Sequence, residues 1–394
     1  MKILIIADGR SPITRRWIRM LQPLEHTIDL ISTYPCQPIE GVNETIIFPV
    51  AFANLSGSQA GGGTNKPGRR MVSRYRGLAA TVRHWLGPLT ITRLEKDYLA
   101  LLKRLEPDLV HALRIPYEGM LASRTPAEIP LVISTWGNDF TYHAISNGVM
   151  GSATRRALLR ADGLMADTTR DLRIARTWSF NPAKPSISLP GNGGIDLEEM
   201  ESITRGIGLA VPWHVINPRG FRSGSVRNDT FFKSIPHILS LHPEVQFVCP
   251  WMAGQAEALR WVNKLRIFDN VSLLPMISQA ELWREFARSL VSVSVSEHDG
   301  TPNSLLEAMA IGCLPVCGDI ESIREWINNG ENGILVDPND PYALAEAMQR
   351  GIVDENFRRA AAERNLEIIR ARAEVSAVRE QVVEFYSRMT GYAI

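Results

Sequence analysis

The stretch VSVSVSEHDGTPNSLLEAMAIGCLPVCG, residues 291–318, predicts a strand, a loop, a helix and a second strand in that order. Its first five residues alternate apolar and small polar side chains, which is typical of a β-strand. The Asp-Gly and Thr-Pro pairs that follow are turn signals and cannot continue the strand. Residues 304–311 then predict a helix, with Asn303 or Ser304 as its N-cap. Because a helix N-terminus offers unpaired N–H groups and the positive end of the helix dipole, this loop is a candidate site for a phosphate or diphosphate.

Two carboxylates frame the candidate anion site: Asp299 in the loop and Glu307 one turn into the helix, with seven residues between them. A carboxylate would repel a bound phosphate, so we interpret both as acceptors for sugar hydroxyls on either side of it. A nucleotide-sugar matches this pattern, since it carries a ribose at one end, a hexose at the other and a diphosphate between them. The alternative is that Asp299 only caps a turn and Glu307 lies on a solvated helix face.

The size and charge of the chain exclude several classes of protein. Its 394 residues predict two domains, each able to bury a core. A formal net charge of +1 argues against a dedicated nucleic-acid binder. No apolar run approaches the roughly 20 residues of a membrane-spanning helix, and the first run, residues 3–7, is too short for a signal peptide, so we expect a cytoplasmic protein. The cysteines lack metal-ligand spacing, and Cys313 and Cys317 are expected to pack beside a buried strand.

Strands and helices alternate along both halves of the chain. The predicted strands lie at residues 2–7, 27–32, 107–112, 131–135, 213–217, 245–249, 271–274, 291–295 and 333–336. This alternation predicts an α/β fold with two Rossmann-like, doubly wound parallel-sheet domains that face a cleft. The first turn has no G-x-G-x-x-G motif, which argues against a dinucleotide-dependent oxidoreductase. The Gly- and Pro-rich residues 189–196 predict a hinge, so we expect domains at 1–195 and 196–375 and a last helix at 376–394.

A basic segment follows a Gly- and Ser-rich stretch, residues 56–68, which predicts a mobile loop. No Asp or Glu occurs from residue 45 through residue 94, and apolar side chains are interspersed. The basic residues are Lys66, Arg69, Arg70, Arg74, Arg76, Arg83 and Arg93. A basic amphipathic segment of this kind can lie on an anionic membrane surface. The alternative is an ordinary surface helix with one face in the core.

The segment from residue 299 onward resembles the donor site of the retaining family-4 glycosyltransferases, also called glycosyl transferases group 1, which have the GT-B fold. The signature of that family is an acidic residue, seven residues, then Glu, followed by Ala-Met-Ala and a Gly-x-Pro-Val strand. The matching residues here are Asp299, Glu307-Ala308-Met309-Ala310, Gly312-Cys313-Leu314-Pro315-Val316, Glu325 and residues 332–340. The first acid is usually Glu in the family, and Asp299 is one methylene shorter. The resemblance also implies that the last helix packs back onto the first domain.

The resemblance implies a donor site in the second half of the chain. Arg219 and Arg227 would hold the donor diphosphate, with Arg222 competing with Arg227 for the second position. Fixed guanidinium groups would stabilise the negative charge that develops on the leaving nucleoside diphosphate. The N–H groups of Leu305 and Leu306 would contact the same diphosphate.

The sugar, ribose and base of the donor have expected partners as well. Asp299 and Asn303 would bind the donor sugar and Glu307 the ribose, while Met276 lies in the loop that would hold the base. The loop and helix start between these groups complete the expected donor contacts: Gly300, Thr301, Pro302 and Ser304.

The resemblance also implies an acceptor side in the first half. Gly9 would allow close backbone approach and Arg10 would meet an anionic acceptor, or else they form a tight turn and a solvated cation. His111 follows a Pro-Asp lead-in and is either structural or at the edge of the acceptor site. Many relatives carry a histidine where this chain has Trp136, so that role does not transfer. Instead, Asp139 would contact sugar hydroxyls and Trp136 would stack on a sugar face, unless Trp136 belongs to the core.

The expected function is that of a retaining glycosyltransferase that moves a hexose from a UDP- or GDP-sugar to a glycan or lipid-linked acceptor in cell-surface polysaccharide synthesis. The leaving phosphate would take the acceptor proton, because no protein base is evident. No Asp-x-Asp triad with a metal context occurs, so we expect neither a metal nor another cofactor. Two alternatives stay open: a nucleotide-sugar 2-epimerase and a catalytically silent nucleotide-sugar-binding protein.

Overall fold

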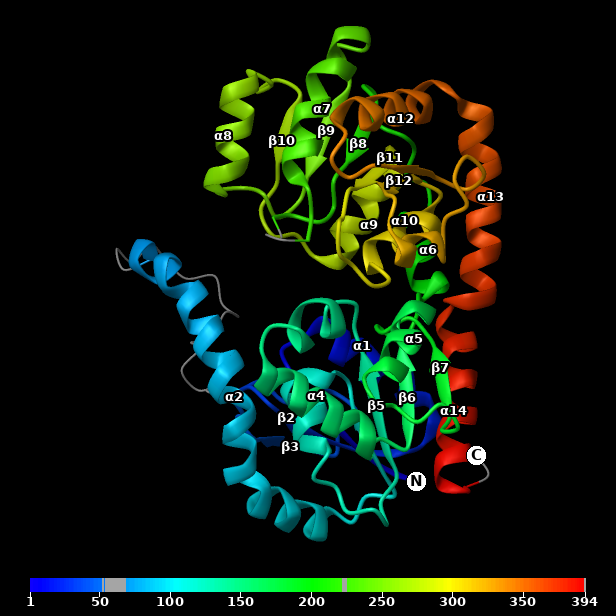
Figure 1. Cartoon of the computed structure of the whole chain (residues 1–394). Coiled ribbons are helices and arrows are strands. Elements are labelled where there is room, and N and C mark those ends of the chain that lie inside the picture. Colours follow the sequence, from blue (N-terminus) through cyan, green and yellow to red (C-terminus); the bar gives the residue numbers. More distant parts are fainter. Residues whose placement is uncertain (52, 54–68, 222–224, 393–394) are drawn as a thin grey trace. The chain divides into compact units, whose positions relative to one another are not determined.

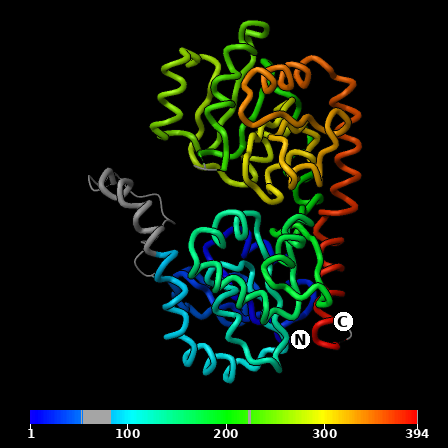
Figure 2. Tube along the Cα trace, in the orientation of Figure 1, coloured from blue at the N-terminus to red at the C-terminus, as the bar shows by residue number. Residues whose placement is uncertain are grey.

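The computed structural model describes the chain except for residues 52, 54–68, 222–224 and 393–394 and the side chains of residues 69–82 (Figure 2). The predicted mobile loop and Arg222 therefore lie outside the described residues, as do the side chains of the first half of the predicted basic helix. The chain forms two compact units. Unit 1 comprises Met1–Gly193 and Val378–Ile394, and unit 2 comprises Gly194–Ala377.

Unit 1 contains a seven-stranded sheet in which all strands are parallel, in the order β3-β2-β1-β4-β5-β6-β7 (Figure 1). The strands are β1 (Lys2–Ala7), β2 (Thr27–Ser32), β3 (Glu44–Ile47), β4 (Leu109–Ala112), β5 (Leu131–Thr135), β6 (Gly163–Ala166) and β7 (Ser186–Ser188). The central strands are runs of buried apolar residues because helices cover both faces of the sheet. The strand order reverses between β1 and β4, and ligands of such sheets bind at that reversal, beyond the carboxyl ends of the strands.

Helices cover this sheet on both sides. They are α1 (Pro12–Leu21), α2 (Arg69–Leu105), α3 (Met120–Ala122), α4 (Gly148–Arg160), α5 (Thr169–Thr177) and α14 (Val375–Thr390). Helix α1 begins where Ser11 accepts a hydrogen bond from the N–H of Ile13 at 3.2 Å. It buries Trp17, Ile18 and Leu21, as its sequence periodicity predicts.

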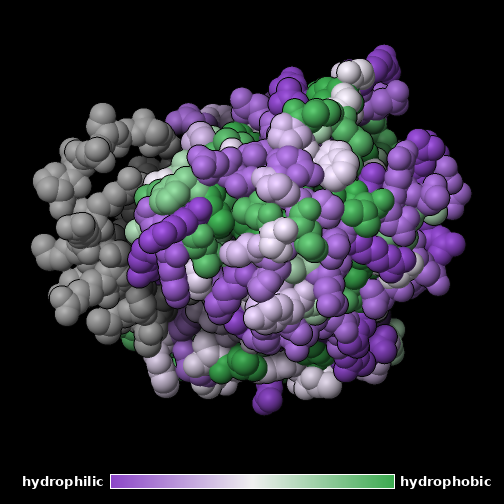
Figure 3. Space-filling view, turned by 90° about the horizontal axis from the view of Figure 1, so that it is seen from above, coloured by the Kyte–Doolittle hydropathy of each residue, from purple (hydrophilic) through white to green (hydrophobic). Residues whose placement is uncertain are grey.

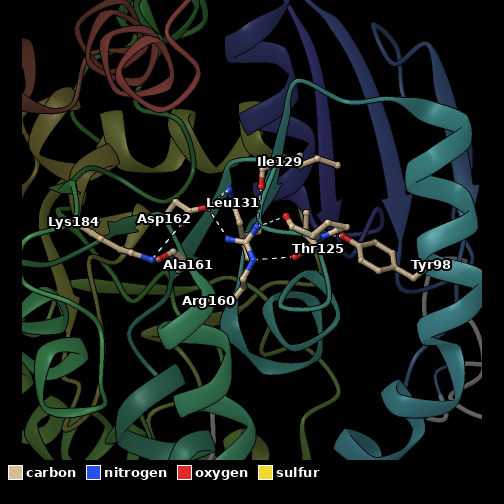
Figure 4. Close-up of polar contacts among 9 residues, drawn as sticks. Tyr98, Thr125, Ile129, Leu131, Arg160, Ala161, Asp162 and Lys184 are labelled. Atoms are coloured by element: carbon tan, nitrogen blue, oxygen red, sulfur yellow. Dashed lines mark hydrogen bonds and ion pairs between the residues drawn. The ribbon is translucent and has the colours of Figure 1, made fainter.

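A network centred on Arg160, the last residue of α4, joins the loops at the amino-terminal ends of the strands (Figure 4). Its guanidinium donates to the carbonyl oxygens of Thr125 and Ile129 at 2.9 and 2.8 Å and to Asp162 at 2.6 Å. Asp162 in turn accepts the N–H of Leu131 at the start of β5. These bonds satisfy carbonyl groups where the chain turns back into the sheet. The loops at the carboxyl ends of the strands are therefore the ones available to bind a ligand.

Unit 2 contains a six-stranded parallel sheet in the order β10-β9-β8-β11-β12-β13. The strands are β8 (His214–Ile216), β9 (Gln246–Cys249), β10 (Val271–Leu273), β11 (Ser289–Ser294), β12 (Leu314–Gly318) and β13 (Ile334–Val336). The helices are α6 (Leu197–Thr204), α7 (Asn228–Leu241), α8 (Ala256–Leu265), α9 (Gln279–Arg288), α10 (Asn303–Ile311), α11 (Glu321–Arg324), α12 (Pro341–Val353) and α13 (Glu355–Arg372).

The strands of unit 2 alternate their side chains between two hydrophobic clusters. Val215 and Val316 pack with α7, α8 and α12, whereas Ile216 and Cys317 pack with α6, α9 and α10. Cys313 and Cys317 are buried free thiols, which confirms their predicted packing role. The order of this second sheet reverses between β8 and β11. The carboxyl ends of β8 and β11 are therefore the expected ligand position in this unit.

The start of α10 differs from the sequence prediction. The N-cap is Pro302, and no side chain caps the helix, whereas Asn303 or Ser304 was expected in that role. Pro302 has the extended conformation of an N-cap, with φ of −69° and ψ of 126°. The ring of proline fixes that φ value, so the chain enters the helix without needing a polar cap. Gly312 ends the helix at a φ of +90°, a conformation that glycine adopts without strain.

The described helices include none that is both long and apolar enough to cross a membrane. The face of the molecule in Figure 3 is mainly hydrophilic, with apolar residues scattered among polar ones.

Helix α14 is tied to the sheet of unit 1 by a buried polar network. The imidazole of His111 in β4 bonds the Tyr386 hydroxyl at 2.6 Å through Nδ1 and the Ser134 hydroxyl at 2.8 Å through Nε2. Burial lowers the pKa of His111 to about 3, so the ring is neutral and both nitrogens are satisfied. Gly163 leaves the space that the ring of Phe385 fills.

We expect Tyr386→Phe to weaken this attachment. It removes a buried hydrogen bond and leaves one His111 nitrogen without a partner, which should lower the free energy of unfolding by about 1–3 kcal/mol. Tyr392→Phe is the control, because the Tyr392 hydroxyl bonds Asp108 at 3.2 Å on an exposed surface. Urea denaturation measures both variants, and a midpoint for Tyr386→Phe equal to that of Tyr392→Phe would contradict the anchoring role.

Candidate functional site

Two predicted site residues meet at the reversal point of the second sheet. Arg219 follows β8 and Asp299 follows β11, and these strands are neighbours. The Arg219 guanidinium donates a short hydrogen bond from Nη2 to Oδ2 of Asp299. The side chains are only 6% and 16% exposed, respectively. Because both charges are largely removed from water, each depends strongly on the other.

Neighbouring hydroxyl and amide groups hold the Asp299 loop in place. Ser296 Oγ donates to Asp299 Oδ2 at 3.3 Å, and the N–H of Gly300 donates to Oδ1 at 3.1 Å. The Asp299 carbonyl accepts the hydroxyl of Ser322 at 2.8 Å. One residue after Gly300, Thr301 Oγ1 accepts the indole N–H of Trp326 at 3.0 Å. The predicted donor loop is thus a preorganised structure with its backbone fixed on both sides.

The opposite partner, Arg219, is fixed by its own loop. Asn217 Oδ1 accepts the N–H of Arg219 at 3.3 Å, and the Asn217 amide donates to Asn228 at 3.2 Å. Asn228 donates to the carbonyl of Gly220 at 2.9 Å, and Gly220 has a φ of +62°. This turn points the guanidinium toward Asp299 and needs glycine for its left-handed residue.

Two of the predicted diphosphate contacts are used within α10. The N–H groups of Leu305 and Leu306 donate to the carbonyl of Pro302 at 3.0 and 3.3 Å. The expectation that these two amides are open to a diphosphate is therefore wrong, because Pro302 as N-cap shifts the first helical bonds to them. In the described part of the chain, however, Ser304 Oγ and Arg219 Nε are buried atoms without a partner. Buried polar atoms in native proteins are rarely left unsatisfied, so each of these two atoms is available to bond a ligand or an ordered water.

Arg227 lies at the same edge of the sheet but is occupied by protein partners. Its guanidinium donates to Asp229 at 2.8 and 3.0 Å, to Glu297 at 2.7 Å and, by a shorter contact, to Asn339. The hydrogen bonds to Asp229 raise the pKa of Arg227 above its ordinary value. The N–H of Arg227 donates to Val295 at 2.8 Å. Arg227 therefore holds the loops after β8 and β11 together.

The two remaining predicted donor residues lie in different environments. Glu307 in α10 is only 2% exposed and makes protein contacts. Met276, in the loop after β10, is 84% exposed. Glu307 was expected to bind a ribose. To do so, its carboxylate would have to exchange its protein contacts for contacts with the ribose hydroxyls. No three His, Cys, Asp or Glu side chains among the described residues gather in the way that a metal site requires.

In unit 1, a cavity of about 210 Å³ lies at the carboxyl ends of β1, β2, β4 and β5. Its lining residues are Ala7, Asp8, Ser11, Tyr34, Arg83, Leu113, Arg114, Pro116, Tyr117, Glu118, Trp136 and His143. The cavity spans the strands where the order of the first sheet reverses, which is where such a sheet binds ligands. Of the residues predicted for the acceptor side, only Trp136 lines it.

The residues predicted near the first turn serve the protein itself. Arg10 pairs with Asp8 through two hydrogen bonds of 3.0 and 2.9 Å and stacks over the ring of Tyr34 at 3.7 Å. A Cβ atom on Gly9 would lie 2.5 Å from Cys36 Sγ and 2.9 Å from Ser32 Oγ. Gly9 is therefore required by the packing of its own chain.

Two predicted site residues are buried and form hydrogen bonds within the protein. Asp139 is 0% exposed and accepts hydrogen bonds from Arg114 Nε at 2.9 Å and from the N–H groups of Ile115 and Trp136 at 3.1 and 3.2 Å. It positions Arg114 and the turn, so the expected contact with sugar hydroxyls is corrected. His111 is also fully buried, which corrects its acceptor-side role in favour of the structural alternative.

Sequence reasoning missed Arg114, Glu118, Tyr34 and Tyr117, and it placed Arg83 in the basic segment and not at a ligand site. Tyr34 and Arg114 each come two residues after a predicted strand, and that spacing could have placed them at the carboxyl ends of the strands, where ligands bind. Tyr117 has a φ of +69° and a ψ of −50°, which is rare for a residue with a side chain. Such strain concentrates at functional sites, but no sequence pattern reveals it.

The carboxyl group of Glu118 lines this cavity. It is buried, and Thr33 Oγ1 donates to its Oε1 at 2.8 Å. Burial raises the pKa of Glu118 to about 7, and the charges of Arg114 and Arg83 only partly oppose the rise. Glu118 is therefore partly protonated near neutral pH, when an ordinary glutamate is ionised.

Glu118→Gln should change the pH dependence of stability. Because the pKa of Glu118 is higher in the folded than in the unfolded state, stability falls as pH rises from about 4.5 to about 7, by at most about 3 kcal/mol. The introduced amide stays neutral at every pH, so the variant should gain thermal stability over wild type at pH 8 but not at pH 4.5. Glu40→Gln, at an exposed position, is the control. A melting-temperature difference that is the same at both pH values would contradict the burial of this charge.

Comparison with known proteins identifies the class of protein to which these two units belong. Residues 228–367 match the family described as Glycosyl transferases group 1, and residues 75–168 match the family described as Glycosyl transferase 4-like. Together the two matches cover more than half of the chain.

Similar proteins agree with this match. The D-inositol 3-phosphate glycosyltransferase of Thermobifida fusca is 23% identical over 215 residues, which are 50% of this chain and 49% of that protein. The chain spans about half, or less, of the length of the curated relatives that it matches. Sucrose-phosphate synthase from Thermosynechococcus elongatus has a similar structure, with a TM-score of 0.71 at 17% identity and 100% coverage of both chains. The Anabaena protein HepE in complex with UDP-glucose has a TM-score of 0.69 at 15% identity, covering 98% of this chain and 100% of that one.

The chain belongs to the glycosyl transferases group 1 family, GT4, and has the GT-B fold of that family. The expected fold class is confirmed, with parallel α/β sheets of seven and six strands. The enzyme class that this family defines is the glycosyltransferases.

Proposed function

We propose that the protein is a retaining glycosyltransferase that moves a hexose from a UDP- or GDP-sugar to a hydroxyl of a glycan or lipid-linked acceptor. One observation carries the proposal: the buried pair of Arg219 and Asp299 lies at the reversal point of the second sheet, in the loops beside the start of α10. Arg219 Nε and Ser304 Oγ have no protein partner among the described residues. A diphosphate offers the oxygens that both atoms lack.

The proposed reaction needs no cofactor to balance. The bond between C1 of the hexose and its phosphate oxygen breaks while the acceptor oxygen forms a bond to C1 on the same face. The acceptor proton passes to the leaving phosphate oxygen, so the products are a glycoside and a nucleoside diphosphate. Because the leaving group gains negative charge as the bond breaks, Arg219 would bind it more tightly in the transition state than in the ground state.

The remaining donor groups have proposed partners in the same loop and helix. Asp299 and Asn303 would take the hexose hydroxyls, and Glu307 would take the ribose. Arg227 would contribute positive potential while it holds the two loops together. The family match and the solved complex of HepE with UDP-glucose support a nucleotide-sugar donor.

The acceptor and its location belong to the proposal as well. A cell-surface polysaccharide or its lipid-linked precursor is the proposed acceptor, made in the cytoplasm. Helix α2 supports contact with a membrane surface, because it exposes Trp85, Leu86 and Leu89 and also exposes Arg93.

Incubation of the protein with a panel of UDP- and GDP-sugars separates this function from its alternatives. We expect slow release of nucleoside diphosphate from one donor in the panel, measured by anion-exchange chromatography. An isomerised sugar would instead identify a 2-epimerase, and binding without turnover would identify a silent nucleotide-sugar-binding protein. Either of these outcomes would contradict the proposal.

Arg219→Ala should lower turnover of the active donor by about 10²–10³-fold, because a fixed donor to the leaving group is lost. The dissociation constant of the donor should rise by a smaller factor, since the charge develops during the reaction. Arg359→Ala is the matched control, because Arg359 is an exposed arginine of α13 that pairs with Glu355. Steady-state kinetics and calorimetry give the two quantities. Turnover equal to that of Arg359→Ala would remove Arg219 from the site.

Glu307→Ala should weaken nucleoside diphosphate binding by about 10–100-fold, since a charged acceptor for the ribose hydroxyls is lost. Glu307→Gln tests the same contact with less disturbance of the buried position and should show a weaker loss in the same direction. Isothermal titration with UDP and GDP measures the change, and circular dichroism checks the fold. Unchanged affinity in a folded Glu307→Ala variant would refute the ribose contact.

A further inference from the structure

The cavity of unit 1 contains charged side chains that the proposed transfer does not use. Arg83 comes from α2, while Arg114 and Glu118 come from the chain that follows β4. The volume of about 210 Å³ corresponds to about seven water molecules. It is smaller than the roughly 300–1,000 Å³ of a site for a drug-sized ligand. The cavity therefore suits one small group, such as an anion together with the ring that carries it.

Each carboxylate around the cavity is either paired with an arginine or partly protonated. Asp8 is held by Arg10 through two hydrogen bonds, and Asp139 is held by Arg114 at 2.9 Å. Glu118 is buried against Thr33, and burial raises its pKa to about 7, so it carries only part of a negative charge at neutral pH. These groups together leave little negative charge to balance a further cation.

Arg83 supplies a further positive charge in this cavity. Its guanidinium lies over the rings of Tyr117 and Tyr34, at 4.4 and 5.3 Å from the ring centroids. In the part of the chain that the structure describes, Arg83 has no ion pair, and its Nε is buried without a hydrogen-bond partner. His143, which also lines the cavity, adds no charge, because burial lowers its pKa to about 3. The cavity thus has an excess of positive charge that an anion would balance.

The surroundings hold Arg83 in this position. The Tyr117 hydroxyl donates to the Arg83 carbonyl at 3.2 Å, which fixes the helix to the turn. One helical turn later, Gly87 lets α2 approach closely, because a Cβ atom there would lie 2.6 Å from the ring of Tyr117. Tyr117 itself keeps a strained backbone with a φ of +69°. A strained residue that supports an unpaired cation is a feature of a binding site more than of a simple core.

We propose that this cavity binds an anionic group of the acceptor, a phosphate or a carboxylate, through Arg83 and Arg114. Arg114 contributes because only its Nε is engaged by Asp139, and its guanidinium lies 5.5 Å from the ring of Trp136. Trp136, which lines the cavity, offers an aromatic surface for the ring that carries the anion. The inference rests on the proposed function only in identifying the ligand as the acceptor. The binding that it predicts is independent of any donor.

A matched set of ligands tests the charge requirement. Glucose 6-phosphate, glucuronate and glucose share a ring and differ in carrying a phosphate, a carboxylate or no charge. Isothermal titration at constant ionic strength and without nucleotide should show at least one anion binding tenfold or more tightly than glucose. Glucose binding as tightly as both anions would overturn the proposal.

Variants on α2 locate the binding. Arg83→Gln should weaken binding of the preferred anion by about 10–100-fold, because a charge-assisted hydrogen bond is lost. Arg83→Lys should retain part of the affinity. Arg93→Gln is the matched control, because Arg93 lies on the same helix at an exposed position and the charge change is the same. Equal affinity in Arg83→Gln and wild type, or an equal loss in Arg93→Gln, would contradict the proposal.

A further arm distinguishes a soluble acceptor from a lipid headgroup, since both supply the same phosphate. Vesicles of phosphatidylcholine with and without phosphatidylglycerol replace the sugar ligands in a sedimentation assay. A larger loss of vesicle binding in Arg83→Gln than in Arg93→Gln would identify a headgroup in the cavity, whereas an equal loss in both would reflect the basic surface of α2 and argue against it. Failure of the donor panel would refute the transferase while leaving these binding results intact, so the two proposals can fail separately.

Discussion

The buried ion pair between Arg219 and Asp299 is the interaction on which the donor site and its proposed chemistry depend. A pair with so little solvent exposure persists only if each charge is also held by its loop, because removing charges from water is costly. Asn217 holds one loop, while Ser296 and Ser322 hold the other. A cation kept in this way is preorganised for an anionic ligand, since little reorganisation is needed when the ligand arrives.

The two units share one feature of sheet topology but differ in the charged groups beside it. Each parallel sheet reverses its strand order once, and each places its charged loops at the carboxyl ends of the strands beside that reversal. In unit 2 the cation is matched by a carboxylate, so Asp299 offsets part of the positive charge that Arg219 presents. In unit 1 the carboxylates are paired with arginines or partly protonated, and Arg83 remains in excess. The proposed donor site and the proposed acceptor site would therefore differ in charge balance while sharing a fold.

The long central strands could be predicted from sequence because each is a buried apolar run, as in residues 2–7 and 131–135. The edge strands β3 and β7 were not predicted, because they are short and only partly buried. Residue type suggested roles for Asp139 and His111, but their hydrogen-bond partners Arg114 and Tyr386 are distant in sequence. Periodicity and spacing report which residues face a core or a turn, and they do not report which polar groups pair with each other.

Calorimetric titration of Asp299→Asn with a nucleoside diphosphate tests the central claim most directly. In wild type the carboxylate of Asp299 offsets part of the positive charge of Arg219, and in the variant that position is neutral. We predict that the variant binds the nucleoside diphosphate at least as tightly as wild type, while its preference for the sugar-bearing donor is lost. Weaker binding of the nucleoside diphosphate by a folded Asp299→Asn variant would contradict this claim.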